Sequence, residues 1–172
     1  EAIKKLKFVP FEDIGYAKVD YHRALRKGFP EVVFCQNKSK EQVVSIIRKL
    51  TSRNGDIIAT RATEEMFKEV KKHIKNAKFN EISKTIIISK NNKLKKGKIL
   101  VVSAGTSDIN VAEEAAVVAE TMGSNVERLY DVGVAGIHRL FSNKEKLQDA
   151  NVLIVVAGMD GVLPSVVSGL FG

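Results

Sequence analysis

Three stretches rich in apolar residues in the second half of the chain are each followed by a glycine-containing polar loop. They span residues 98–103, 126–130 and 152–157. The first is nearly continuous in apolar residues, which is typical of a parallel strand buried on both faces. Right-handed helical crossovers between parallel strands bring the following loops to one edge of the sheet. The pattern therefore predicts a βαβαβα unit with a ligand-binding edge.

Helical patterns fill the segments between these stretches. We expect a helix from about Val111 to Met122, ended by Gly123, because glycine readily adopts the left-handed conformation that closes a helix. A second helix should follow the loop 131–136 and run to about Leu147. A third should start near Pro164, since proline is tolerated in a first helical turn.

The first half of the chain predicts a smaller α/β domain. Ser39 and Gln42 have capping-box spacing, so a helix should start there and end at Asn54-Gly55. Thr63 should cap a second helix, whose buried stripe comprises Met66, Phe67, Val70 and Ile74. Strands are expected over residues 31–35, 56–60 and 84–89, whereas residues 16–31 fit neither period throughout.

Charge divides the chain in the same place. Residues 1–98 hold 24 basic and 11 acidic residues, a net charge of +13, whereas residues 99–172 hold 4 and 9, a net charge of −5. The junction 91–98 is polar, basic and turn-prone, as a surface connection should be. We therefore place one domain at residues 1–97 and the second at residues 98–172.

The basic first half raises the question of a nucleic-acid partner. Lysines outnumber arginines 21 to 7, and many lie on expected solvent faces of helices, for example Lys68, Lys71, Lys72 and Lys75. No nucleic-acid motif or exposed aromatic residues interleave with them. We interpret the lysines as surface solvation, with nucleic-acid binding as a minor alternative.

Cysteine, histidine and hydropathy exclude other classes. The one cysteine and three histidines (Cys35, His22, His73 and His138) form no zinc-binding pair and no disulfide framework, which favours a cytoplasmic location. Cys35 ends an apolar run, so we interpret it as a small buried hydrophobic residue. Asp160 and glycines interrupt the apolar stretch 152–171, so we expect no membrane span.

Two of the loops carry groups suited to a phosphorylated ligand. In the loop 103–108, hydroxyls and backbone N–H groups at a helix N-terminus could hold a phosphate, with Asp108 accepting from ribose hydroxyls. Equally, these residues could simply cap the helix. In the loop 131–139, His138 titrates near neutral pH and Arg139 can hold phosphate bidentately, which we interpret as functional. No dinucleotide fingerprint or Walker loop occurs.

Five sequence blocks, in order, carry a resemblance to a known family. They are Gly15-Tyr16-Ala17-Lys18-Val19-Asp20; Arg23-x-x-Arg26-x-Gly28-x-Pro30-Glu31; Ser103-Ala104-Gly105-Thr106-Ser107-Asp108; Asp131-Val132-Gly133-Val134-Ala135-Gly136-Ile137-His138-Arg139; and Ala157-Gly158-Met159-Asp160-Gly161-Val162-Leu163-Pro164-Ser165. The chain resembles the LarB-type family of nickel-pincer cofactor biosynthesis, related to the catalytic subunit of phosphoribosylaminoimidazole carboxylase. This implies a three-layer, Rossmann-like parallel-sheet domain.

The resemblance implies an enzyme that adds CO2 to the pyridinium ring of nicotinic acid adenine dinucleotide. Hydrolysis of the phosphoanhydride would release AMP and pyridinium-3,5-biscarboxylic acid mononucleotide. It implies proton transfer by His138 and a place for Asp160 near the reacting end. Arg23 and Arg26 are our candidates for interdomain phosphate contacts, and simple surface or salt-bridge roles are equally open. The implied substrate- and phosphate-binding residues are Ser103, Gly105, Thr106, Ser107, Asp108, Asp131, Gly136, Arg139, Gly158, Met159, Gly161, Leu163, Pro164 and Ser165.

Further expectations come from the same resemblance. It implies no tightly bound cofactor and no protein metal site, although Mg2+ could assist the phosphoanhydride step, and it implies a homo-oligomer, an octamer in the carboxylases. In this family the nucleophilic cysteine lies in a part that would follow Gly172, so we expect a C-terminally truncated chain and do not assign the nucleophile to Cys35.

Two other functions stay open. One is an aminoimidazole ribonucleotide carboxylase or mutase of purine biosynthesis, against which the basic first half argues. The other is a regulator that binds nucleotide without turnover.

Overall fold

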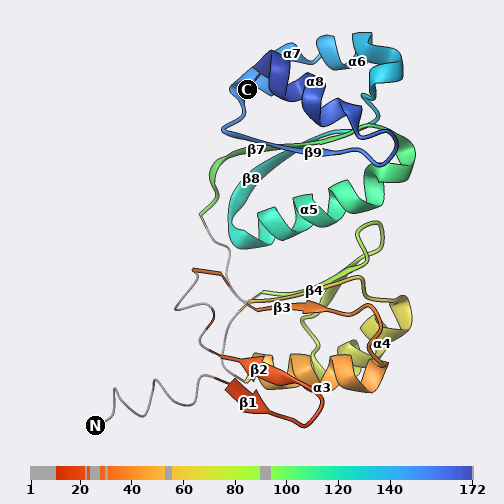
Figure 1. The fold of residues 1–172 in the computed structure, drawn as a ribbon. Coiled ribbons are helices and arrows are strands. Elements are labelled where there is room, and N and C mark those ends of the chain that lie inside the picture. The colour runs from red at the N-terminus through yellow and green to blue at the C-terminus, as the bar shows by residue number, and fades with distance from the viewer. Residues whose placement is uncertain are drawn as a thin grey trace. The chain divides into compact units, whose positions relative to one another are not determined.

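The protein forms two compact units, residues 1–92 and residues 93–172, each with its own sheet and core (Figure 1). The computed structural model describes residues 11–21, 23, 28, 29, 31–52, 56–89 and 94–171. The mixed α/β architecture and the parallel sheet of the second unit are the fold class predicted from the sequence. The predicted helix end at Asn54-Gly55 and the candidate Arg26 lie outside the described residues.

The first unit is built on a four-stranded sheet in the order β3-β4-β6-β5. Its strands are β3 (Val32–Phe34), β4 (Ile57–Thr60), β5 (Lys78–Asn80) and β6 (Thr85–Ile88). β3 and β4 are parallel, whereas β6 runs antiparallel to both β4 and β5. The sequence did not predict β5, because three residues are too few to show a strand period.

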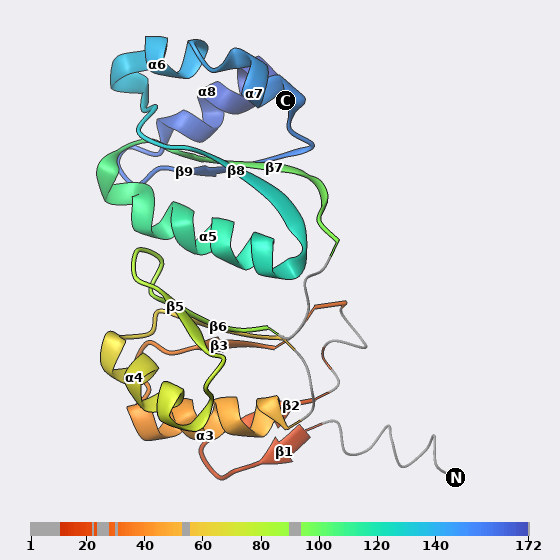
Figure 2. The ribbon, with the colours of Figure 1, turned by 180° about the vertical axis from the view of Figure 1, so that it is seen from behind.

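Two helices pack on one face of this sheet (Figure 2). In α3 (Lys40–Thr51), the Gln42 N–H donates to Ser39 Oγ at 3.3 Å and the Ser39 N–H donates to Gln42 Oε1 at 3.0 Å, which confirms the capping box. In α4 (Glu64–His73), the Met66 N–H donates to Thr63 Oγ1 at 3.3 Å, which confirms that cap as well.

A short hairpin, β1 (Phe11–Asp13) and β2 (Lys18–Asp20), adds to the first unit. Its turn includes Gly15 at φ +87°, and the Gly15 N–H donates to Asp13 Oδ1 at 2.8 Å. Val19 from β2 reaches the core of the unit. The sequence indicated no regular element here, since strands of three residues are fixed by pairing rather than by their own pattern.

The second unit is a parallel sheet in the order β8-β7-β9. β7 (Lys96–Ser103) lies between β8 (Ser124–Leu129) and β9 (Val152–Val156). Leu100, Val101 and Val102 of β7 are fully buried, as expected for a central parallel strand. The strand starts at Lys96, so the boundary expected after Gly97 from the sequence lies inside it.

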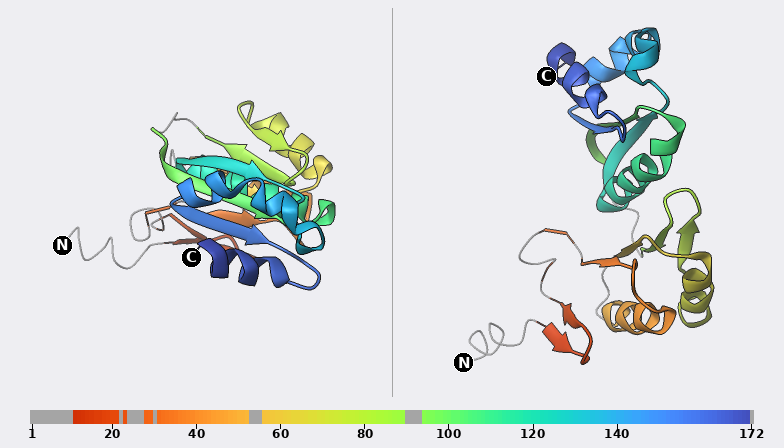
Figure 3. Two further views of the ribbon diagram at one scale, coloured as in Figure 1. Left: turned by 90° about the horizontal axis from the view of Figure 1, so that it is seen from above. Right: turned by 45° about the vertical axis from the view of Figure 1, so that its right-hand side comes forward.

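Helices cover both faces of this sheet (Figures 1 and 3). The helix α5 (Ile109–Met122) packs on one face through Ala112 and Ala116, and Gly123 ends it at φ +100°, as predicted. On the other face lie α6 (Ile137–Phe141), α7 (Lys144–Asp149) and α8 (Val162–Phe171). This unit therefore has the three layers expected of it.

The single helix predicted up to Leu147 is wrong, because the chain forms α6 and α7 with a break between them. Asn143 Nδ2 donates to the Arg139 carbonyl at 3.0 Å, and Ser142 Oγ donates to the same carbonyl at 2.9 Å. Serine and asparagine compete for backbone groups in this way, which favours helix ends over helix interiors.

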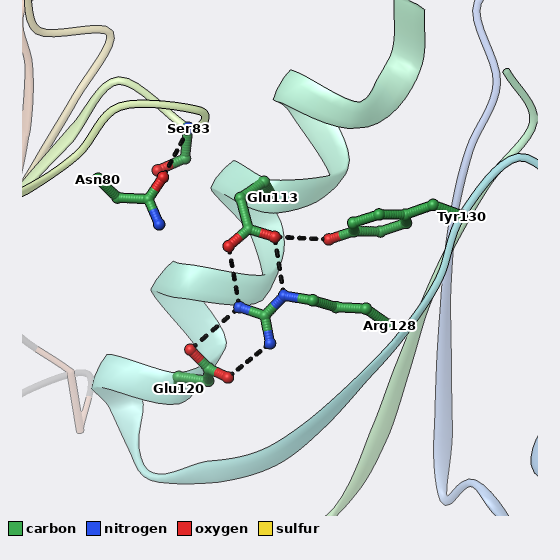
Figure 4. Close-up of polar contacts among 6 residues, drawn as sticks. All are labelled: Asn80, Ser83, Glu113, Glu120, Arg128 and Tyr130. Atoms are coloured by element: carbon green, nitrogen blue, oxygen red, sulfur yellow. Dashed lines mark hydrogen bonds and ion pairs between the residues drawn. The ribbon is translucent and has the colours of Figure 1, made fainter. Parts of the chain in front are cut away.

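A network of charged side chains joins β8 to α5 (Figure 4). Arg128 donates to both oxygens of Glu113 at 2.7 and 3.0 Å and to both oxygens of Glu120 at 2.8 and 3.2 Å. Tyr130 Oη donates to Glu113 at 2.7 Å. The hydrogen bonds to Glu113 and then Glu120 raise the pKa of Arg128 further, so the guanidinium stays charged. The network fixes an edge strand to the helix that covers it.

None of the helices described in the structure combines the length and the hydrophobicity that a membrane crossing requires.

Replacing Arg128 by Met should destabilise the second unit. The substitution leaves Glu113 and Glu120 next to each other without their cation, and partial exposure moderates the cost to about 1–2 kcal/mol. Urea unfolding followed by circular dichroism measures this. Lys98→Met is the control, because it also removes a cation from two carboxylates, but Glu127 and Asp149 are more exposed (43% and 69%) than Glu113 and Glu120 (9% and 31%). It should therefore lower the midpoint less than Arg128→Met does. Equal losses in both variants would contradict a special role for Arg128.

Candidate active site

The candidate site lies at the carboxyl ends of β7 and β9. From β7 the chain passes through α5 to β8 on one side, and then through α6 and α7 to β9 on the other side. In open α/β sheets, ligands bind at the point where neighbouring strands are connected in opposite directions. In this unit that point is between β7 and β9, where the chain leaves Ser103 and Val156.

The loop after β7 leads through a turn of 3-10 helix (Thr106–Asp108) into α5. Asp108 Oδ2 accepts from the Gly105 N–H at 2.9 Å, and Asp108 Oδ1 accepts from the Gly158 N–H at 3.0 Å. In this structure the Asp108 carboxylate therefore caps the start of the 3-10 turn. Its contact with ribose hydroxyls stays a prediction. Thr106 and Ser107 are exposed, and within the described part of the chain their hydroxyls have no hydrogen-bond partner. They are free to contact an anion.

The loop after β8 is held closely against the end of β7. The Asp131 N–H donates to the buried Ser103 Oγ at 3.3 Å, and the Val132 N–H donates to the Ser103 carbonyl at 3.1 Å. The Gly133 N–H donates to the Ala104 carbonyl at 2.8 Å. A Cβ on Gly133 would lie only 2.8 Å from that same oxygen. Only glycine therefore fits at position 133 without movement of the backbone.

Arg139 is held in place at this edge by two contacts. Its Nη1 donates to Asp131 Oδ2 at 2.8 Å, and its Nε donates weakly to the Gly136 carbonyl at 3.4 Å. The side chain lies so close to Gly136 that a Cβ there would be 2.8 Å from Nε. Within the described residues Nη2 has no partner, so part of the guanidinium is open to an anion.

His138, in the first turn of α6, and Asp160, in the loop after β9, are the predicted catalytic residues, and both are exposed. Neither has a side-chain partner among the residues that the structure describes. Met159 is 92% exposed, and Gly161 has φ +73°, a conformation that favours glycine. These side chains are accessible to a ligand, and their catalytic roles stay predictions.

Other predicted site residues have packing roles. Ser103 is fully buried, and its hydroxyl holds the loop after β8. Leu163 is buried in the core beneath α8, Pro164 is half-buried, and Ser165 is exposed. Ser103 and Leu163 therefore help to hold the backbone of the site in place. The side chains exposed at the sheet edge come from residues next to them in the sequence.

Cys35 is fully buried, as predicted for a small hydrophobic residue. Burial raises the pKa of its thiol to about 11. The thiol is therefore protonated at neutral pH and a poor nucleophile.

Two features of the first unit bear on ligand binding. Arg23 lies over the Phe29 ring at 4.9 Å, and its predicted interdomain role stays a prediction. A cleft of about 730 Å³ lies along α3. It is lined by equal numbers of acidic side chains (Glu12, Glu41, Glu69) and of lysine and arginine side chains (Lys40, Arg48, Lys49), so it has no charge preference for a phosphate.

Among the described residues, no three His, Cys, Asp or Glu side chains come together in a way that could hold a metal ion.

Sequence reasoning missed the two close loop contacts of this site. The Gly133–Ala104 approach and the bridge from Asp108 to Gly158 join residues far apart in the chain. The available signal was the presence of a glycine, Gly133 or Gly158, in each of two consecutive loops. That signal did not show which other segment each glycine would approach.

Gly133→Ala should destabilise the second unit by about 1–3 kcal/mol, because the added methyl meets a backbone oxygen that cannot move independently. Thermal unfolding measures the change. Gly169→Ala is the matched control, since a Cβ there meets nothing within 4 Å and alanine is the better helix former. It should leave stability unchanged or slightly raised. A Gly133 variant as stable as the wild type would contradict the close approach.

Comparison with known proteins places the chain in a family. Residues 11–91 match the LarB/PurE-like N-terminal domain. The chain is also 42% identical over 180 residues to the uncharacterized protein MJ0165 of Methanocaldococcus jannaschii, an alignment covering 99% of this chain and 70% of the relative. The domain match covers the first unit, and the relative extends the similarity through the loops of the second. The chain therefore belongs to the LarB/PurE-like family.

Proposed function

We propose that the protein acts in the carboxylation of the pyridinium ring of nicotinic acid adenine dinucleotide. Membership of the LarB/PurE-like family indicates a carboxylase- or mutase-type enzyme. The proposed products are pyridinium-3,5-biscarboxylic acid mononucleotide, for nickel-pincer cofactor biosynthesis, and AMP. The observation that carries the proposal is the joining of three polar loops at one sheet edge. The loop after β7 offers exposed hydroxyls, and Arg139, which follows the loop after β8, is partly open.

Electrostatics supports a phosphate at this edge. Residues 99–172 have a net charge of −5, and their two arginines are Arg128 and Arg139. Arg128 is committed to Glu113 and Glu120. An anionic ligand therefore needs a local cation, and Arg139 can supply it together with backbone N–H groups of the loop after β7.

His138 and Asp160 are proposed to act on the ring. A pyridinium ring attacks CO2 only after a nucleophile has added to it. Afterwards a ring proton must leave and the bond to the nucleophile must break, which expels the nucleophile and restores the aromatic ring. His138 is accessible and of a type that exchanges protons near neutral pH. The nucleophile in this scheme is a cysteine thiolate, and Cys35 does not fit because its thiol is buried and protonated. The proposal for these residues is therefore binding and proton transfer.

The N-terminal domain favours the pyridinium substrate over aminoimidazole ribonucleotide. A purine-pathway carboxylase needs no basic domain before its carboxylase fold, whereas this chain has a LarB/PurE-like N-terminal domain over residues 11–91. Both reactions share a phosphoribosyl substrate, so phosphate binding alone does not separate them.

A mass-spectrometric product assay tests the reaction. The natural gene product and, separately, this 172-residue chain are incubated with nicotinic acid adenine dinucleotide, 13C-bicarbonate and Mg2+. We expect labelled dicarboxylated mononucleotide and AMP from the natural gene product. Cys35→Ala should retain activity, because the thiol lies in the core rather than at the sheet edge.

Other results would redirect the assignment. Carboxylation of aminoimidazole ribonucleotide in place of the dinucleotide would establish the purine-pathway reaction. Tight nucleotide binding without any product would indicate a regulator. Loss of activity in a folded Cys35→Ala protein would assign the nucleophile to the first unit, against this proposal.

Arg139→Ala should weaken binding of nicotinic acid mononucleotide by about 10- to 100-fold, as expected for hydrogen bonds to a charged group. Arg139→Lys should fall between, because it keeps the charge and loses the planar fork. Isothermal titration calorimetry measures the affinities. The matched control is Lys144→Ala, which removes an exposed cation from α7 and should change affinity less than about twofold. Equal effects of the two alanine variants would contradict a direct phosphate contact by Arg139.

A further inference from the structure

Asp108 joins the two loops on either side of the point where the strand connections diverge. One carboxylate oxygen accepts from the Gly105 N–H in its own loop, and the other accepts from the Gly158 N–H, 50 residues further along the chain. A Cβ on Gly158 would lie 3.1 Å from Asp108 Oδ1. The loop after β9 thus passes directly over the carboxylate.

The hydrogen bond from the Gly158 N–H to Asp108 anchors the part of this loop that extends past the end of the sheet. The ladder between β7 and β9 ends at the pair Ser103 and Val156, and the Ala104 N–H donates to the Val156 carbonyl. Beyond that point, no other hydrogen bond joins residues 158–161 to the loop after β7 among the residues that the structure describes. The exposed Asp160 follows two residues after Gly158.

We propose that Asp108 is a positioning residue, which sets the distance between the phosphate-binding loop after β7 and the Asp160-bearing loop after β9. This inference rests on the proposed function, since it assumes that a ligand lies between these loops. A carboxylate suits the task because both oxygens are acceptors, whereas asparagine would turn an N–H2 group toward one of the two backbone donors.

A contact between Asp108 and ribose hydroxyls, predicted from the sequence, is the competing role. Both oxygens of Asp108 already accept backbone N–H groups of the chain itself. The positioning role predicts that Asp108 acts on the ligand through Gly158, whereas the ribose role predicts direct contact. The two roles therefore differ in whether the ligand's hydroxyl groups matter.

Amide hydrogen exchange in the free protein provides the first test. Asp108→Asn should speed exchange of the Gly158 N–H by about tenfold or more, because it loses a hydrogen bond to a charged acceptor. Asp149→Asn is the matched control, since it removes an exposed carboxylate that pairs with Lys98 near the start of β9, at the other end of the sheet. It should leave Gly158 unchanged. Unaltered Gly158 exchange in both Asp108→Asn and Asp108→Ala would overturn the proposal.

Ligand binding provides the second test. Affinities of wild type and Asp108→Asn are measured for nicotinic acid mononucleotide and for its 2′,3′-dideoxy analogue. The positioning role predicts that Asp108→Asn lowers the affinity for both ligands by the same factor. In the product assay it should lower kcat by a larger factor than it changes KM. A loss confined to the ligand with hydroxyls would show direct ribose contact and overturn the proposal.

The two proposals can fail separately. If wild type binds neither nucleotide and forms no product, the proposed function fails. The exchange rates of Gly105 and Gly158 still decide whether Asp108 holds the two loops together.

Discussion

The pairing of β7 with a parallel strand on each side is the constraint on which the candidate site depends. Leu100, Val101 and Val102 are fully buried between the two helical layers, so the strand has no freedom to shift. Its last residue, Ser103, then holds the loop after β8 through its hydroxyl and its carbonyl. Ala104 contacts both neighbouring segments, accepting from Gly133 and donating to Val156. The end of one buried strand therefore positions all three loops.

The elements predicted correctly from the sequence are those with local causes. The caps at Ser39 and Thr63 and the glycine end of α5 at Gly123 depend on residues within one helical turn. The central strand was predictable because burial on both faces leaves a nearly continuous apolar run. These patterns also placed the polar loops at one edge before any contact was known.

The features that were missed depend on contacts between distant residues. Asn143 ends α6 by bonding to the Arg139 carbonyl, although the apolar spacing through Leu147 fits a continuous helix. The charged network of Arg128 needs α5 and β8 side by side, which no local pattern reveals. The second acceptor contact of Asp108 likewise exists only once β9 lies next to β7.

The close approach of Gly133 to Ala104 has a consequence for engineering the specificity of this protein. Because the two backbones touch with no room for a side chain, the loops after β7 and β8 behave as one mechanical part. A loop taken from another enzyme to replace residues 131–139 would need the matching backbone at residue 104 as well. Substitutions can therefore be introduced more readily in the loop after β9. Met159 and Asp160 are exposed there, and the loop is attached to the loop after β7 through a side chain, by the hydrogen bond from the Gly158 N–H to Asp108.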